Sequence, residues 1–470
     1  MHAKTFYALV AAALVALLAA FWISRGDAPL SESNLANAPL LPGLRDQLNA
    51  VDAVTFTGAA NQSIASFKRG ADGWHIAEKS GFPADVAKLR ELLLKLADAN
   101  VIEAKTANPA RYAELGVDDP ASVKCDAPAT AVDAGDKANA QKKCLDGHGV
   151  LVTLGGVKAS LKLIVGLYNG GGGGGTFARR DGEARSVLAS GNLGIDRNAA
   201  AWIRHELVDI DAARIKEVRL TGLDGKTLRV YKEQSVDASF KVADVPAGRT
   251  LASDFVANSL GSGLSSLRAD DVAAAKDSPA PPEALARAMN TEGRIVDKTA
   301  AGAYKIRYLA FGGLVVDVTA WDANGKNLIQ LVASNDSAQL DADIAAEQGK
   351  AKAAYDTAVT AARLKATEAK GDEAAIAKAA GEVPKPAAIA DAAKDRAERI
   401  AAANKIVEDL NKTFAGWTFT VPAYEFANFN KSMEELLKPL ETKPIVGNKA
   451  LDIKPADTQP SLKLAPRPVQ

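Results

Sequence analysis

An uninterrupted apolar stretch near the start of the chain dominates its hydrophobic pattern. Residues 6–23 read FYALVAAALVALLAAFWI, and as a helix they would extend about 27 Å, close to the hydrocarbon thickness of a bilayer. A cleaved signal peptide is the alternative, but bulky Phe21 and Trp22 follow Ala20, where small residues would mark a cleavage site. We therefore expect residues 1–25 to form a cytoplasmic stub and a single-pass transmembrane anchor, with Lys4 on the cytoplasmic side.

A polar, proline-punctuated tether is expected at residues 26–43, before a series of short alternating segments. Segments with the two-residue period of strands fall at 51–57, 64–69 and 74–77. Asp85 then stands where a helix cap is expected. The apolar positions of that helix are Val86, Leu89, Leu92, Leu93 and Leu96. This pattern predicts a three-stranded meander followed by a helix.

The same order recurs in the second half of the chain. Strand-like segments fall at 215–221, 227–232 and 239–242, and residues 251–267 take the place of the helix. Further strands follow each set, at 150–154, 160–166, 176–180 and 186–189, and at 304–311, 314–321 and 327–333. The stretches VLAS (187–190) and LVAS (331–334) end the two series, and Trp202 and Trp417 follow them.

We therefore expect an α+β fold of two tandem copies of a meander–helix–sheet unit, at residues 44–210 and 211–440. Chance similarity between amphipathic segments is the alternative. A loop insertion is expected at 121–148 in the first copy. An Ala-rich insertion at 335–412 in the second copy has helical spacing, and we expect a helical hairpin or short antiparallel coiled coil, serving as a solvated spur or as a docking arm. Residues 441–470 have the composition of a disordered tail.

The chain has two cysteines, Cys125 and Cys144, and both lie in the first insertion. A disulfide between them would close a loop of about 20 residues and stabilise the fold by roughly 3 kcal/mol in an oxidising compartment. The alternative is two free thiols in a loop. Because the body is expected beyond the membrane, we expect the disulfide.

No pattern in the chain points to catalysis, a metal or a cofactor. His2, His75, His148 and His205 lack metal-ligand spacing, and the glycines at 170–175 lack the lysine of a phosphate loop. Gly261-Ser262-Gly263 is not a nucleophile elbow, and we interpret the pairs Asp118-Asp119 and Asp270-Asp271 as caps or solvated charges. The 57 basic and 57 acidic side chains balance, which argues against nucleic acid as a partner.

Two motifs resemble a known family. Phe82-Pro83-Ala84-Asp85 opens the leucine-rich helix, and residues 111–120 read RYAELGVDDP. With the N-terminal anchor, these are similar to the bacterial domain of unknown function 4340 family (DUF4340), over about residues 44–220 and more loosely beyond. The resemblance implies an accessory component of a gliding-motility-type ABC transport complex. The cysteine-bounded loop and the Ala-rich insertion depart from the family pattern.

These observations lead to three functional hypotheses. The first is an interaction or scaffold protein, not an enzyme, anchored in the bacterial inner membrane with its body in the periplasm and a protein partner in the same membrane. The second is a binding module for a small molecule or an envelope polymer, in a cleft between the two units. The third is an envelope hydrolase whose site one sequence does not reveal.

Overall fold

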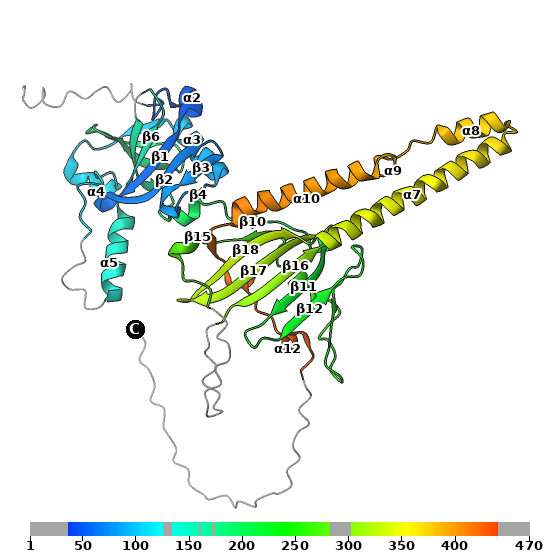
Figure 1. The fold of residues 1–470 in the computed structure, drawn as a ribbon. Coiled ribbons are helices and arrows are strands. Elements are labelled where there is room, and N and C mark those ends of the chain that lie inside the picture. The colour runs from blue at the N-terminus through cyan, green and yellow to red at the C-terminus, as the bar shows by residue number, and fades with distance from the viewer. Residues whose placement is uncertain (1–35, 126–133, 159–160, 172–173, 283–301, 440–470) are drawn as a thin grey trace, which may run out of the picture.

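The computed structural model describes residues 36–125, 134–158, 161–171, 174–282 and 302–439. These residues form two large antiparallel sheets and several helices, which confirms a mixed α+β fold (Figure 1). The predicted anchor at 6–23 and the tail at 441–470 lie outside the described residues. Among the described residues, no helix has the length and apolar character needed to cross a membrane.

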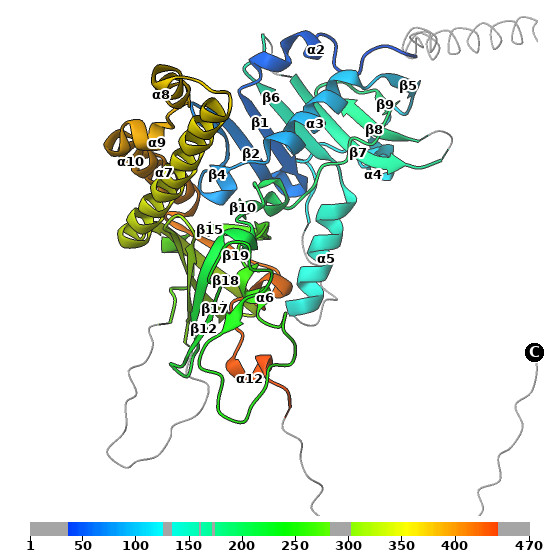
Figure 2. The same ribbon diagram turned by 90° about the vertical axis from the view of Figure 1, so that its right-hand side faces the viewer.

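The first sheet has the strand order β4-β3-β2-β1-β6-β7-β8-β9-β5. Its strands are β1 (Ala53–Gly58), β2 (Gln62–Gly70), β3 (Gly73–Ile76), β4 (Phe82–Pro83), β5 (Val101–Ala104), β6 (Val150–Gly155), β7 (Leu161–Asn169), β8 (Gly175–Arg180) and β9 (Ser186–Ala189). The associated helices are α2 (Leu44–Gln47), α3 (Val86–Asp98), α4 (Tyr112–Leu115) and α5 (Ala134–Gly147). Figure 2 shows α3 lying against the sheet and α5 projecting away from it.

Helix α3 begins as the sequence predicts. The Asp85 side chain accepts a hydrogen bond from the Lys88 backbone N–H at 2.9 Å, which satisfies a donor that the helix itself leaves free. The four predicted leucines are buried, whereas Val86 is 47% exposed. The first turn of α3 therefore lies outside the core.

The last residues of the expected tether pack against the body. Leu40 and Leu41 are buried, and Arg180 donates a hydrogen bond to the Leu40 carbonyl oxygen at 2.7 Å. Pro39 also forms an isolated bridge with Asn100. The two leucines supply apolar area that is better buried than solvated, so the body begins several residues before residue 44.

The second sheet has the strand order β13-β12-β11-β16-β17-β18-β19-β15. Its strands are β11 (Ile215–Thr221), β12 (Thr227–Tyr231), β13 (Lys241–Val242), β15 (Asp271–Ala274), β16 (Tyr304–Ala310), β17 (Leu314–Ala323), β18 (Lys326–Asn335) and β19 (Trp417–Thr420). The short helices α11 (Ala423–Phe426) and α12 (Met433–Leu436) follow β19. Each segment predicted as a strand in either unit contains one.

The helix predicted at residues 251–267 is wrong in extent. Only α6 (Asn258–Gly261) is helical there. A Cβ on Gly261 would lie 2.0 Å from the Phe240 ring, and one on Gly263 would lie 2.3 Å from Tyr308 Oη. The backbone of this segment thus approaches the sheet more closely than a regular helix with side chains would permit.

Apart from β4, the two sheets arrange their strands in the same order along the chain. In this order β9 corresponds to β19, and β8 to β18. The equivalence of VLAS and LVAS is therefore wrong, because residues 187–189 lie in β9 whereas residues 331–334 lie in β18. The Ala-rich insertion consequently replaces the turn between β8 and β9. Duplication of the unit stays a prediction.

The Ala-rich insertion forms the helical arm that projects from the second sheet in Figure 1. Its helices are α7 (Ser337–Glu368), α8 (Glu373–Gly381), α9 (Ala387–Ala390) and α10 (Ala392–Phe414). In α7 only Leu340 and Ile344, at the base, are buried. Polar contacts join α7 to α10, among them Arg399 to Glu347 at 2.5 Å. The predicted helices are confirmed, but a coiled-coil core is not supported.

The two units contact each other directly. Phe82 in β4 packs against Trp417 and Phe419 of β19, with ring centroids 5.1 and 5.9 Å apart. Lys79 Nζ lies 2.5 Å from Asp271 Oδ1, next to this aromatic contact. A two-stranded sheet, β10 (Glu206–Val208) with β14 (Leu267–Arg268), also lies between the units. One continuous apolar core includes residues of both units.

Candidate functional site

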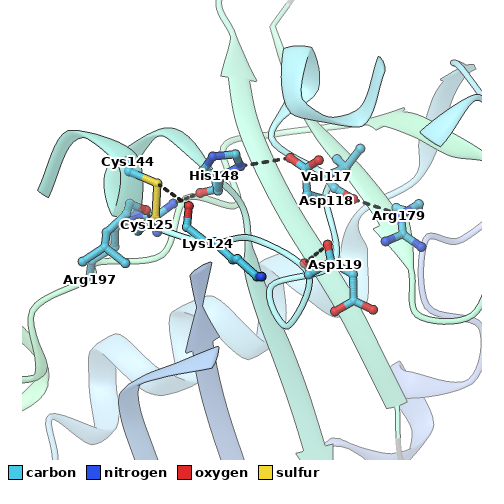
Figure 3. Close-up of polar contacts among 11 residues, drawn as sticks. Val117, Asp118, Asp119, Lys124, Cys125, Cys144, His148, Arg179 and Arg197 are labelled. Atoms are coloured by element: carbon cyan, nitrogen blue, oxygen red, sulfur yellow. Dashed lines mark hydrogen bonds and ion pairs between the residues drawn. A yellow bond between two sulfur atoms is a disulfide. The ribbon is translucent and has the colours of Figure 1, made fainter. Parts of the chain in front are cut away.

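The two predicted site residues lie together in the first unit. Cys125 and Cys144 form a disulfide with their Cα atoms 5.6 Å apart (Figure 3). Cys144 belongs to α5, a helix inside the segment expected to be a loop, and Cys125 is buried. The disulfide therefore fastens a projecting helix to the body of the unit.

Two further contacts hold the C-terminal end of α5. His148 Nδ1 lies 3.0 Å from Asp118 Oδ2 (Figure 3). The Arg197 guanidinium donates to the Leu145 carbonyl oxygen at 2.8 Å and also to the His148 carbonyl oxygen. A cation is favourable at a helix C-terminus, where carbonyl groups lack partners.

Burial lowers the pKa of Arg197, whereas the negative charge of Asp146 acts in the opposite direction. The guanidinium stays charged, because arginine titrates far above neutral pH. Arg197 cannot be recognised from the sequence, since it is 53 residues from Cys144 with no recognisable motif around it. Only the fold brings the two positions together.

A cavity of about 570 Å³ lies beside α5. One wall is formed by α5 residues, and the other by residues near β1 and β2 and by residues 196–198. The lining side of α5 is Ala138, Gln141, Lys142 and Leu145, and the opposite wall includes Gly58, Ala59, Gln62 and Ile64. Its polar lining combines amides with charges of both signs, such as Lys142, Asp146 and Arg197. This chemistry suits a small polar molecule with both donors and acceptors more than a simple anion.

The motif at residues 111–120 has a structural role. Arg179 is buried, donates to the Val117 carbonyl oxygen at 2.9 Å and lies over the Tyr112 ring. Tyr112, Val117 and Ile164 form a small apolar cluster on the first sheet. Gly116 ends α4 with a positive φ of 64°, which glycine adopts without strain. The motif thus covers one face of the sheet.

The remaining polar candidates are engaged locally. His75 contacts Asp72 and the Gly81 carbonyl, and the hydrogen bond to Asp72 raises the pKa of His75. His205 Nδ1 lies 2.7 Å from the Ala269 carbonyl oxygen. Gly170, Gly171 and Gly174 lie between β7 and β8, and Gly175 is the first residue of β8. In the part of the chain that the structure describes, no three His, Cys, Asp or Glu side chains could share a metal ion.

One of three comparisons with known proteins found a match. Residues 74–287 match a family model described as "Domain of unknown function (DUF4340)". Neither the comparison with curated proteins nor that with solved structures produced a match. The match includes the motif at 111–120, the disulfide and the start of the second unit. The resemblance found in the motifs is therefore confirmed: residues 74–287 of this chain match the DUF4340 family model.

Proposed function

We propose that this protein is an interaction or scaffold protein, anchored in the bacterial inner membrane by residues 6–23, with its two units in the periplasm. Its partner is a protein of a membrane complex, and an ABC transport complex is the candidate that the family resemblance suggests. Two tandem copies of one ancestral unit form the body, a reading favoured by the shared strand order of the two sheets.

The helical arm is the observation that carries this proposal. Helix α7 alone has 32 residues, which corresponds to about 48 Å of helix. Beyond its base the arm presents mostly exposed residues, including Leu364 at 59% exposure. An arm of this length contributes little to the core of the second unit. Such an extension is better explained by contact with another molecule than by folding.

The disulfide supports the periplasmic location. Disulfides persist in oxidising compartments, whereas thiols stay reduced in the cytoplasm. Residues 125 and 144 lie on the same side of the predicted anchor as the rest of the body. A single span with Lys4 in the cytoplasm would therefore expose both cysteines to the oxidising side.

Photo-crosslinking in living cells tests the proposal. A photoreactive residue at Leu364 should give a discrete adduct with a membrane-complex protein, identified by mass spectrometry. The same residue at Val236, which is 82% exposed on the body, is the matched control and should give none. An identical adduct pattern at both positions, or no adduct at Leu364, would count against the docking role of the arm.

A shortened arm gives a second test. Gln348 Nε2 donates to the Ala392 carbonyl oxygen at 2.9 Å, so residues 350–390 can be replaced by a short Gly-Ser turn at that level. The base contacts of Arg396 and Arg399 with α7 would remain. The shortened protein should fold and reach the membrane but lose its partner. Retention of the partner would show that the arm is not the docking element.

The alternative function is binding of a small molecule or an envelope polymer, and the cavity beside α5 favours it. We place this site within the first unit, because the two units pack directly against each other at Phe82. Thermal-shift screening of the full chain against polar metabolites and glycan fragments tests the idea. The thermal stabilisation by a bound compound should be lost in the Gln141→Leu variant. Stabilisation that survives this substitution would rule out the cavity as the binding site. An envelope hydrolase remains the third hypothesis.

A further inference from the structure

Three arginines form a cross-strand row on the second sheet. Arg219 in β11 lies directly opposite Arg229 in β12 and Arg307 in β16. The alternate residues Val218 and Leu220 are buried, so the arginine side chains leave the sheet on the face away from the core. Their side chains are 57%, 40% and 54% exposed, in that order.

Two lysines extend this row into a basic surface. Lys305 is two residues from Arg307 in β16, and Lys241 pairs with Tyr231, two residues from Arg229. Strand residues two apart share a face, so both lysines lie on the side of the arginines. We call the surface of Lys241, Arg229, Arg219, Lys305 and Arg307 the arginine face.

Carboxylates only partly neutralise the arginine face. Arg229 donates to Glu217 Oε2 at 2.9 and 2.6 Å, and Arg219 donates to Glu217 Oε1. Lys241 pairs with Glu233 at 2.8 Å, whereas Arg307 Nε lies 3.8 Å from Asp317 Oδ1, beyond hydrogen-bond distance. Three carboxylates thus lie against these five cations, and Asp244 and Asp237 act electrostatically on Arg229 and Lys241 from further away. Glu217 accepts hydrogen bonds from both Arg219 and Arg229. Each guanidinium has five N–H donors, so Glu217 does not engage all of them.

Folding of the sheet does not require this arrangement. Like charges directly opposite each other on neighbouring strands, about 4.8 Å apart, destabilise a sheet. In the first sheet, whose strand order matches, Thr55 lies opposite Ser66 and Thr153. Hydroxyl side chains therefore suffice in the same topology. The arginine row is better explained by an anionic ligand than by stability.

The segments of this chain outside the described residues do not match the charge of the arginine face. Residues 1–35 and 283–301 contain as many basic as acidic side chains, and residues 440–470 contain more basic ones. Residues 126–133 contain two acidic side chains, too few for five cations. A sheet face presents a broad array of side chains rather than the groove or strand edge that a peptide segment uses, and it matches the two-dimensional array of phosphates on a membrane.

We propose that the arginine face binds the phosphate headgroups of anionic phospholipids and holds the second unit against the membrane surface. The proposal rests on the proposed membrane anchoring, because an anchor keeps lipid at high effective concentration. Near an anionic membrane, each basic residue strengthens binding about fivefold. Loss of two arginines should therefore weaken binding roughly 30-fold.

Vesicle flotation with the full chain tests this. The chain is placed in nanodiscs of neutral phosphatidylcholine, which shield the anchor, and mixed with vesicles containing about 30% phosphatidylglycerol, an anionic fraction large enough to attract basic side chains. Arg219→Gln with Arg307→Gln leaves Arg229 to pair with Glu217. Lys350→Gln with Arg363→Gln, both exposed on α7, is the matched control with the same change in charge.

We expect the protein to co-float with anionic vesicles and not with neutral vesicles. The partition coefficient should be about 30-fold lower in the Arg219→Gln, Arg307→Gln variant and unchanged in the control variant. Equal binding of both variants would overturn it, as would equal binding to neutral vesicles. Tighter, arginine-dependent binding to immobilised polyglutamate would assign the face to an acidic protein instead and overturn the lipid proposal. Failure to enter nanodiscs would count against the anchor alone, and the free chain would then enter the same flotation assay.

Discussion

The packing of the motif at 111–120 on the first sheet gives the sharpest stability prediction. A Cβ added to Gly166 in β7 would lie 2.4 Å from the Leu115 carbonyl oxygen, 2.8 Å from Val117 Cγ1 and 3.0 Å from the Gly116 carbonyl oxygen. Two of these three atoms are backbone, so a rotamer change cannot relieve the contact. In Gly166→Ala the motif must move away from the sheet.

The cost follows from what that movement disrupts. Forcing an extra carbon into a packed site costs about 1–3 kcal/mol, and the displaced motif includes the buried side chains Tyr112 and Val117. We expect Gly166→Ala to lower the local free energy of opening by that amount. Native-state hydrogen exchange of peptides covering residues 105–120 measures it, and urea denaturation gives the accompanying global change.

Gly349→Ala is the matched control for this substitution. Gly349 lies inside α7, and a Cβ there would meet no heavy atom within 4 Å. Alanine is a better helix former than glycine by about 1 kcal/mol, so the control should stabilise the arm or leave it unchanged. The reasoning would be refuted if Gly166→Ala exchanged as slowly as the wild-type protein at residues 105–120.

Three further substitutions test other parts of the structure. Cys125→Ala with Cys144→Ala should destabilise the attachment of α5 by about 3 kcal/mol, seen as faster proteolysis within 134–147; an unchanged cleavage rate would show that Arg197 and His148 alone hold the helix. Burial raises the pKa of Glu425 above its usual 4.5, so the contribution of Glu425 to stability is complete below pH 4.5 and is lost as pH rises through the folded pKa. Glu425→Gln should therefore remove this part of the fall in Tm with rising pH, and an unaltered Tm–pH profile would argue against a buried Glu425 as its cause. Among the described residues, Tyr308 Oη is buried and has no hydrogen-bond partner, which costs about 1–3 kcal/mol. Tyr308→Phe should therefore be neutral or stabilising in a thermal melt, and a clear loss of Tm would reveal a partner.

Local periodicity predicted the strands well where a strand has one buried and one polar face. In β11, for example, buried Val218 and Leu220 alternate with polar Glu217, Arg219 and Thr221, and such alternation is visible in the sequence alone. The segment at 251–267 misled the same reasoning. Its apolar residues recur at helical spacing, but Gly261 packs closely against Phe240 and Gly263 against Tyr308. Both partners are distant in the sequence, so local spacing does not reveal these contacts.

The arginine row and the attachment of α5 depend on strand register and on tertiary contacts, which one sequence does not reveal. Arg219, Arg229 and Arg307 look like three isolated surface charges until strand pairing places them in one row. Likewise Arg197 becomes part of the α5 attachment only because the fold brings it to Leu145. The cysteine pair was easier to anticipate, since two cysteines leave a single possible bond.

The boundaries of the family match bear on where function should be sought. The match starts at residue 74, after β1 and β2, and ends at residue 287, before β16. Yet β3 pairs with β2, β11 pairs with β16, and β15 pairs with β19. The matched region therefore completes neither sheet by itself, and left alone it would expose unpaired strand edges. Residues 53–70, which supply β1 and β2, and residues 302–439, which supply β16 and β19 as well as the arm and Arg307, must be part of the folded body on which the matched region depends.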